Sequence, residues 1–219
     1  ALAQWIGEQT GATVGYLTEA ANTVGAQWVQ AQPQKDGKNA GEMLTGAIKA
    51  AILLNTEPAF DAAAGAKGLE QADMVITLSP FKANLDISDV LLPVAPFTET
   101  SGTFVNAEGR VQSFHAVVKP LGETRPAWKV LRVLANLLEL PGFDYESSQD
   151  VLTAAIGAET KEVPSALRSN ITKVAAKVPE NEAAEPVTAS IYQLDGIVRR
   201  ATSLQLTADA RLAREGGAA

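Results

Sequence analysis

Short apolar runs separated by prolines, glycines and polar turns set the pattern of the first two thirds of the chain. The run 51–54 ends in Asn-Thr-Glu-Pro, and the run 74–78 ends in Ser-Pro. Continuous apolar runs of this length are typical of strands buried on both faces of a sheet. The alanine-rich stretch between them predicts a helix over 61–67. Strand, helix and strand in this order predict a βαβ unit with a parallel sheet and a right-handed crossover.

The segments before this unit alternate between helical and irregular patterns. Apolar residues at helical spacing predict a helix from the start of the chain to Gly11, and 12–17 is typical of a short extended strand. The polar stretch 19–39 is predicted to be mostly loop. Asn39 is followed three residues later by Glu42, which predicts an N-cap with its reciprocal partner. The helix behind this cap carries an apolar face made of Met43, Leu44, Ala47 and Ile48.

The segments after the unit complete the predicted domain. The run 90–94 predicts another strand, and 113–118 alternates loosely as one more strand would. A helix is predicted over 127–140, where Pro141 and Gly142 stop it. Its buried face is predicted to consist of Trp128, Leu131, Leu134, Ala135 and Leu138. Residues 1–141 are therefore predicted to form an α/β domain, with a Rossmann-like, mostly parallel sheet flanked by helices.

The composition changes after residue 142, where acids and turn formers replace the apolar runs. We interpret 142–219 as an acidic linker followed by a mainly helical and irregular C-terminal extension. One short helix is predicted to begin near Ser148, and Thr207 is predicted to cap a last helix that runs through Arg214. An apolar face that docks on the domain or on a partner is predicted from Ile191, Leu194, Ile197 and Val198.

Charge and composition narrow the possible partners and chemistry. The chain has 219 residues with 18 basic and 25 acidic side chains, a net charge of −7, which argues against nucleic acid and anionic membrane surfaces as partners. It has no cysteine and one histidine, so disulfides, iron–sulfur ligation and most zinc sites are not expected within it. No apolar run approaches the roughly 20 residues of a membrane helix, so direct membrane insertion is not expected. The chain starts inside an uncapped helical pattern, and we therefore expect it to be part of a longer polypeptide.

The segment ETSGTFVNAEGRVQ, residues 99–112, carries the densest set of candidate functional residues. Gly102 and Gly109 accept positive φ and Asn106 tolerates it, so a tight loop or an irregular hairpin is predicted after a buried strand. In one interpretation, its backbone amides and Arg110 hold an anionic or polar ligand at the end of the sheet. In the other, it is a self-satisfied hairpin with a carboxylate–guanidinium pair.

Other candidate residues give weaker signals, and we predict no catalytic or metal-binding residue. His115 has no serine or cysteine partner in a motif, which favours a structural role. Asp86 and Asp89 flank a short turn, as capping aspartates do. Ser79 lacks both the G-x-S-x-G context and a base. The Arg199–Arg200 pair is open to two interpretations, because it could bind a carboxylate on another subunit or remain solvated.

Several stretches together resemble a known family. ADMVITLSPF and DVLLPVAPFTETSGTFVNAEGRVQ resemble the pterin-side signature of the molybdopterin oxidoreductase superfamily. TGATVGYLTEAANTVGA, RPAWKVLRVLANLLEL and IYQLDGIVRRATSLQ resemble the C-terminal part of the large iron–sulfur subunit of bacterial NADH–quinone oxidoreductase, respiratory complex I.

This resemblance implies a structural, cofactor-free portion of a peripheral-arm subunit, in a membrane-anchored complex on the cytoplasmic side of the inner membrane. It implies iron–sulfur clusters upstream in the parent subunit, and the other peripheral-arm subunits as partners. The loop is then expected to be an ordered relic of a pterin site without a ligand, formed by Glu99, Gly102, Thr103, Asn106, Glu108, Gly109 and Arg110. Two alternatives stay open: a pterin-cofactor-binding domain of a molybdenum oxidoreductase such as a formate dehydrogenase, and a free-standing α/β module that binds a small ligand.

Overall fold

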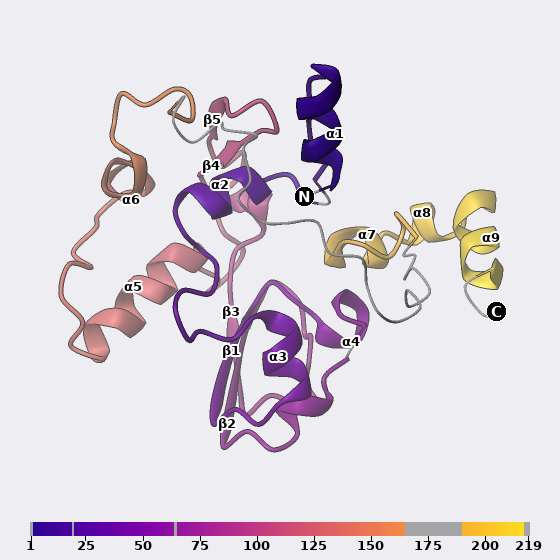
Figure 1. Ribbon diagram of the computed structural model, residues 1–219. Helices are drawn as coiled ribbons and strands as arrows, with labels where there is room; N and C mark the ends of the chain where they lie inside the picture. The colour runs from indigo at the N-terminus through magenta and orange to yellow at the C-terminus, as the bar shows by residue number, and fades with distance from the viewer. Residues whose placement is uncertain (1, 19, 64, 165–189, 217–219) are drawn as a thin grey trace. The chain divides into compact units, whose positions relative to one another are not determined.

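The computed structural model describes residues 2–18, 20–63, 65–164 and 190–216 (Figure 1). These residues form two compact units, which we describe separately. The first, called the hairpin unit, comprises the described residues of 1–35, 100–117 and 132–184. The second, called the sheet unit, comprises those of 36–99, 118–131 and 185–219. The predicted domain boundary between 141 and 142 stays a prediction.

A three-stranded parallel sheet is the centre of the sheet unit. Its strands are β1 (Ala50–Leu54), β2 (Met74–Ser79) and β3 (Val90–Pro93), in the order β1-β2-β3. Ile52 pairs with Ile76, and Ile76 with Val90, so all three carboxyl ends lie at one edge. This confirms the predicted α/β class and the parallel arrangement. Only part of the predicted burial occurs, because β2 is largely buried whereas β1 exposes Ile52 and Leu54.

Helix α3 (Ala40–Thr45) and the 3₁₀ turn η1 (Lys67–Leu69) carry side chains that pack against the strands. The Asn39 cap is confirmed: the Glu42 amide donates to Asn39 Oδ1 at 2.9 Å, and the Asn39 amide donates to Glu42 Oε2 at 2.8 Å. The helix ends at Thr45 with Gly46 as its C-cap, so Ala47 and Ile48, which were predicted to lie on its apolar face, follow it. The core cluster that forms beneath it consists of Leu44, Leu53, Leu69 and Val75. The cap fixes where α3 begins, and α3 contributes Leu44 to the core.

The crossover between β1 and β2 differs from the prediction. In place of one helix over 61–67, the chain forms a single turn, α4 (Pro58–Asp61), and then η1. Gly65 has φ +60°, a left-handed conformation that interrupts a right-handed helix. A Cβ on Gly68 would overlap the carbonyl of Leu44, so the chain at η1 approaches α3 as closely as only glycine allows. The alanines suggested a helix, but glycines at the two critical positions prevent it.

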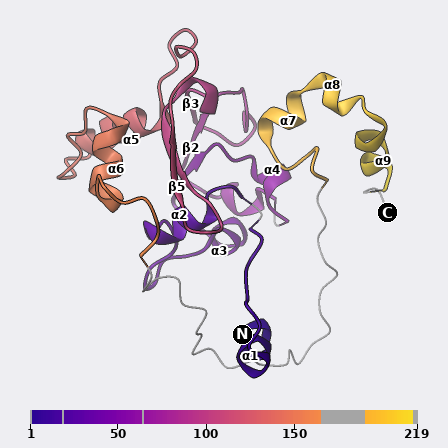
Figure 2. The same cartoon turned by 90° about the horizontal axis from the view of Figure 1, so that it is seen from above.

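The last described elements of the sheet unit are short helices. They are α7 (Gly196–Arg200), α8 (Thr202–Gln205) and α9 (Ala208–Gly216). The Ala210 amide donates to Thr207 Oγ1 at 3.3 Å, as the predicted cap requires. Ile191 and Leu194, predicted to lie on a docking face, are 70% and 57% exposed, so they do not dock on the sheet unit, and docking of this face on a partner stays a prediction. Helix α7 lies beside α4 in both views (Figure 1; Figure 2), although about 140 residues separate them in the sequence.

The hairpin unit contains α1 (Leu2–Thr10), α2 (Thr23–Trp28), α6 (Ser148–Ile156) and a two-stranded antiparallel sheet. The strands of that sheet are β4 (Gly102–Val105) and β5 (Val111–Phe114). Helices α1 and α6 confirm the predictions, and Ser147 caps α6 through Asp150. Residues 12–17 form no strand because they pair with no strand among the described residues. The loop predicted over 19–39 contains α2. Asn22 makes no capping bond there, and its side chain instead accepts from the Val105 amide at 2.8 Å.

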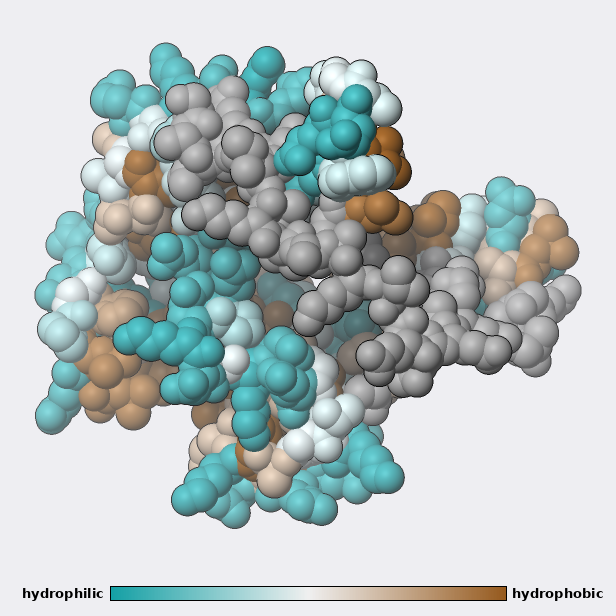
Figure 3. Space-filling model, in the orientation of Figure 1, coloured by the Kyte–Doolittle hydropathy of each residue, from teal (hydrophilic) through white to brown (hydrophobic). Residues whose placement is uncertain are grey.

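Helix α5 (Ala127–Leu137) belongs partly to each unit. Ala135 is buried, and Trp128, Leu131 and Leu134 are half-buried as predicted, whereas Leu138 is exposed beyond the helix end. Hydrophobic side chains of this helix reach the surface (Figure 3), among them Val133 and Leu137. In the described ranges, no helix combines the length and apolar character that crossing a membrane requires.

Candidate functional site

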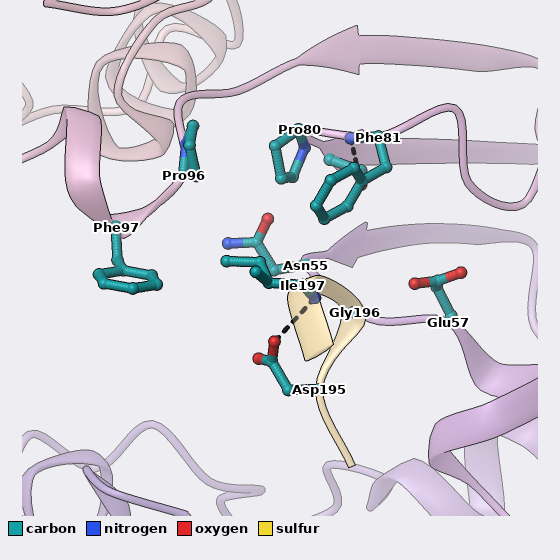
Figure 4. A pocket seen from close by; sticks show the side chains of 10 residues that line it. Asn55, Glu57, Pro80, Phe81, Pro96, Phe97, Asp195, Gly196 and Ile197 are labelled. Atoms are coloured by element: carbon teal, nitrogen blue, oxygen red, sulfur yellow. Dashed lines mark hydrogen bonds between the residues drawn. The ribbon is translucent and has the colours of Figure 1, made fainter. Parts of the chain in front are cut away.

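A crevice opens at the carboxyl edge of the parallel sheet, within the sheet unit. Residues directly after β1, β2 and β3 line it, and the start of α7 faces them (Figure 4). Its volume is about 220 Å³. The lining consists of Asn55, Glu57, Ser79, Pro80, Phe81, Pro96, Phe97, Asp195, Gly196 and Ile197. Open α/β sheets bind ligands at this edge, so the crevice is the candidate functional site.

Local turns bring the ends of β1 and β2 to the crevice. Asn55 takes a left-handed φ of +51°, and its amide donates to the Leu78 carbonyl at 2.9 Å. The Phe81 amide donates to Ser79 Oγ at 3.1 Å, which closes the turn after β2. Ser79 is thus buried and engaged in a turn, and the expectation that it is no nucleophile stays a prediction. β1 and β2 therefore each end in a turn whose following side chains line the crevice.

A clamp of four charged residues borders the crevice, and we call Glu57, Asp61, Arg199 and Arg200 the clamp. Arg200 holds the Glu57 carboxylate with both terminal nitrogens, Nη1 to Oε1 at 2.8 Å and Nη2 to Oε2 at 2.9 Å. Arg199 Nη2 donates to the same Oε1 at 3.0 Å, and its Nη1 donates to Asp61 Oδ1 at 2.8 Å. Bidentate contacts, in which one guanidinium donates to both oxygens of a carboxylate, are the strong form of this ion pair.

Aromatic rings and burial reinforce the clamp. The Arg200 guanidinium lies 4.3 Å from the centre of the Phe81 ring, and that of Arg199 lies 5.0 Å from the Phe60 ring. The Arg199 side chain is 7% exposed and that of Glu57 is 11% exposed. Among the described residues, Arg199 Nε finds no hydrogen-bond partner, which offsets part of this stabilisation. The arginine pair follows neither interpretation as stated: it binds carboxylates instead of remaining solvated, but these carboxylates belong to the same chain and not to another subunit.

The electrostatics keep the clamp charged at neutral pH. The Arg200 hydrogen bond lowers the pKa of Glu57; burial opposes this shift, and the contact with Arg199 adds to it. Burial alone would lower the pKa of Arg199, but its bonds to Asp61 and Glu57 outweigh burial and raise it. The Glu57 bond also raises the pKa of Arg200. A carboxylate held ionised in this way binds and positions, and it is poorly suited to general acid–base catalysis near pH 7.

The loop singled out in the sequence forms the hairpin of β4 and β5. Its turn closes on itself, because Asn106 Oδ1 accepts from the amides of Glu108 at 3.1 Å and Arg110 at 2.9 Å. Gly109 has φ +83°, and Arg110 lies 3.9 Å from Glu108 in an exposed pair. Gly102 and Thr103 lie on β4, where Thr103 Oγ1 is 2.9 Å from Ser113 Oγ. This geometry is that of the self-satisfied hairpin, and the expectation that the loop carries no ligand stays a prediction.

The remaining sequence candidates are not among the residues that line the crevice. Glu99 ends the 3₁₀ turn η2 (Phe97–Glu99) and accepts from the Leu121 amide at 2.9 Å. His115 is exposed directly after β5. Asp89 accepts from the Val75 amide at 2.7 Å, which is a structural bond like the predicted capping role. In the described part of the chain, no three His, Asp or Glu side chains are grouped so that they could hold a metal ion.

A parallel sheet with a crevice at its carboxyl edge defines the Rossmann-like class of ligand-binding α/β proteins. Comparison with known sequences makes the assignment specific. The model of the molybdopterin oxidoreductase family matches residues 2–137, more than half of the chain. The chain belongs to the molybdopterin oxidoreductase family.

Individual relatives match a shorter stretch. The chain is 39% identical over 77 residues to "Putative formate dehydrogenase SAB2186c" of Staphylococcus aureus (strain bovine RF122 / ET3-1), which covers 35% of this chain and 8% of that protein. It is 40% identical over 70 residues to "Probable oxidoreductase YjgC" of Bacillus subtilis (strain 168), which covers 32% of this chain and 7% of that protein. The chain thus matches less than a tenth of the length of these curated relatives. These names do not bear out the finer resemblance to the complex I subunit.

The crevice does not fit a phosphate-bearing pterin cofactor in the arrangement described. Pockets for ligands of that size usually enclose about 300–1,000 Å³, and this one encloses about 220 Å³. The residues that line it include two carboxylates, Glu57 and Asp195, and neither lysine nor arginine. The nearest guanidiniums are turned to Glu57 and Asp61. A phosphate group would therefore meet negative charge unless the clamp rearranged.

Proposed function

We propose that this chain is the pterin-side α/β portion of a molybdopterin oxidoreductase of the formate dehydrogenase type. The observation that carries the proposal is the family match over 2–137, a stretch that contains the whole parallel sheet and its carboxyl edge. The names of the staphylococcal and Bacillus relatives support the formate dehydrogenase type over the complex I subunit. In this role the chain supplies the scaffold next to the cofactor, and no side chain described above is assigned a catalytic step.

The test uses the full-length protein that contains this chain, purified from its own host. We expect molybdenum, measured by inductively coupled plasma mass spectrometry, at about one atom per polypeptide, together with the fluorescent oxidation product of a pterin. We also expect formate to reduce an artificial electron acceptor in its presence. A preparation with neither molybdenum nor pterin would overturn the proposal, whatever its activity toward formate.

A second candidate function is favoured by the clamp. Because α7 and its arginines cover the carboxyl edge, the edge can be a structural surface without a cofactor, as in the resemblance to the complex I subunit. The chain would then support iron–sulfur modules located upstream in its parent subunit and contact other peripheral-arm subunits on the cytoplasmic side of the membrane. The same purification separates the two candidates. In this second case iron and acid-labile sulfide would be present without molybdenum, and subunits that oxidise NADH would co-purify.

A further inference from the structure

Part of the same chain covers the edge at which a ligand of this fold would bind. Asp195 Oδ1 accepts from the amides of Ile197 at 2.7 Å and Val198 at 3.2 Å, which fixes the start of α7 at the crevice. A Cβ on Gly196 would lie 3.0 Å from Glu57 Oε1, so the backbone of α7 rests directly on the Glu57 side chain. The contact between α7 and the strand end after β1 is therefore close, and a side chain at position 196 would require the Glu57 carboxylate to shift.

The arginine side of the clamp has the geometry of a carboxylate site. Three guanidinium nitrogens converge on one carboxylate at 2.8, 2.9 and 3.0 Å, and two aromatic rings flank the guanidiniums. Nothing in the family match or in the names of the relatives assigns a role to these residues.

We propose that Arg199 and Arg200 form a built carboxylate-binding fork, that Glu57 is its resident ligand, and that this fork latches α7 over the carboxyl edge of the sheet. The inference goes beyond the proposed function and holds for either candidate above. In this proposal, the contact of Glu57 with the two arginines determines whether α7 covers the carboxyl edge of the sheet.

The neighbouring groups select a carboxylate over a phosphate. A planar carboxylate matches the planar fork of Arg200 with two parallel bonds. Asp61 occupies the remaining terminal nitrogen of Arg199 and adds a second negative charge beside the site. A second or third negative charge on the ligand would be repelled by Asp61, so a singly charged carboxylate is the class that fits.

The fork predicts chemical rescue in the full-length protein. In Glu57→Ala the side chain is removed and the space of its carboxylate is left, so α7 should detach while the fork remains. We expect amide hydrogen exchange in peptides covering 190–206 to become about tenfold faster or more, since a broken buried ion pair costs well above the free energy of one decade. Added acetate should restore most of the protection, because acetate can occupy the fork that Glu57 has left.

Matched variants make the result decisive. Glu123→Gln removes a carboxylate that is 94% exposed and lies 3.5 Å from Arg125 in the same unit, and we expect unchanged exchange. Arg200→Lys keeps the positive charge but cannot make the bidentate contact, so the amides of α7 should exchange faster, and added acetate should not restore their protection. Hydrogen exchange in peptides covering β2 reports whether the sheet stays folded. If β2 loses its protection in Glu57→Ala, the exchange of α7 in Arg200→Lys, compared with the wild type, tests the proposal. Unchanged exchange in α7, or equal effects of acetate on Glu57→Ala and Arg200→Lys, would overturn the proposal.

Discussion

At the scale of single residues, the clamp shows how two long side chains can attach a distant segment. Glu57 and Arg200 are separated by 143 positions in the sequence, yet they share two hydrogen bonds at 2.8 and 2.9 Å. An exposed ion pair such as Glu108–Arg110 contributes little to stability, because water screens both charges. The Glu57 clamp differs because its carboxylate and the Arg199 guanidinium are largely removed from water. Removing one partner would leave the other charge buried and unpaired.

The clamp should respond to acid through Glu57. Its pKa lies below the ordinary 4.5 because of the Arg200 hydrogen bond, against burial and with the help of Arg199. A carboxyl whose pKa is lower in the folded than in the unfolded protein stabilises the folded state above the unfolded value, and this contribution disappears as the pH falls through the folded value. We therefore expect the difference in thermal unfolding midpoint between the wild type and Glu57→Gln to be constant from neutral pH to about 4.5. Below that pH the difference should shrink.

Thermal unfolding monitored at a series of pH values measures this difference. The charged groups that face Glu57 are Arg199 and Arg200 on α7, with Asp61 on α4 held by Arg199. All three side chains are present in both proteins, so the two proteins differ only in the side chain at position 57. A difference that persists unchanged into strong acid would show that the Glu57 charge does not hold the clamp.

The sequence alone could locate the arginines but not their partner. Arg199 and Arg200 stood out as a possible carboxylate-binding pair, and Glu57 appeared only as part of the polar turn that ends β1. Local patterns report neighbours three or four residues away, whereas this contact depends on how the chain returns to the sheet after 140 residues. The only available signal was an acid just after a predicted strand, at the edge where functional groups gather.

At the scale of elements, capping residues were the most predictable feature. Asn39 with Glu42 shows the reciprocal bonds expected from the sequence, and Ser147 with Asp150 forms a second capping box. The failures were elements whose form depends on glycine or on tertiary contacts. Gly65 interrupts the alanine-rich helix, and α2 forms in a polar stretch where Asn22 contacts β4. Local hydrogen bonds can be predicted from residues close together in the sequence, whereas tertiary contacts such as that of Asn22 with β4 cannot.

The Asn39 cap provides a test at this scale. Asn39→Ala removes the acceptor of the Glu42 amide at the start of α3, the helix that brings Leu44 into the core cluster. We expect the free energy of unfolding of the sheet unit to fall by about 1 kcal/mol. Urea denaturation, monitored through hydrogen exchange in peptides covering β2, measures this change in free energy.

Asn39→Asp is the matched control, because aspartate also accepts from the backbone and is favoured beside the positive end of a helix. We expect Asn39→Asp to unfold at the wild-type urea concentration or above it. If both variants were equally destabilised, the side-chain bond to Glu42 would not be the source of the effect.

At the scale of the molecule, the sheet was predictable and its covered edge was not. Apolar runs predicted the parallel order of β1 and β2, and the carboxyl edge was recognised as the place for a ligand. The residues chosen for that ligand lay in the hairpin of β4 and β5, whereas the crevice is lined by the turns after β1, β2 and β3 and by α7. Within the sheet unit the tail is attached through the ionic contacts of the clamp, while Ile191 and Leu194 remain exposed, and docking of its apolar face on a partner stays a prediction.

Ionic docking of the tail predicts an order of cleavage by trypsin. Trypsin must bind an arginine side chain in its own acidic pocket, so an arginine engaged in a salt bridge has to be released first. Arg199 is 7% exposed and bonded to Glu57 and Asp61, whereas Arg211, on α9, is exposed. In the wild type we therefore expect cleavage after Arg211 well before cleavage after Arg199 and Arg200.

Glu57→Ala should change this order at one place only. Cleavage after Arg199 and Arg200 should accelerate in step with the opening of α7, because the open form is the one that trypsin cuts. Cleavage after Arg211 should keep its rate, since Arg211 makes no contact with the clamp in the described residues, and it serves as the internal control. Mass spectrometry of a time course resolves the three sites. If all of them accelerated together, the variant would have loosened the unit as a whole, and if none did, α7 would be held at the sheet edge by contacts other than the clamp.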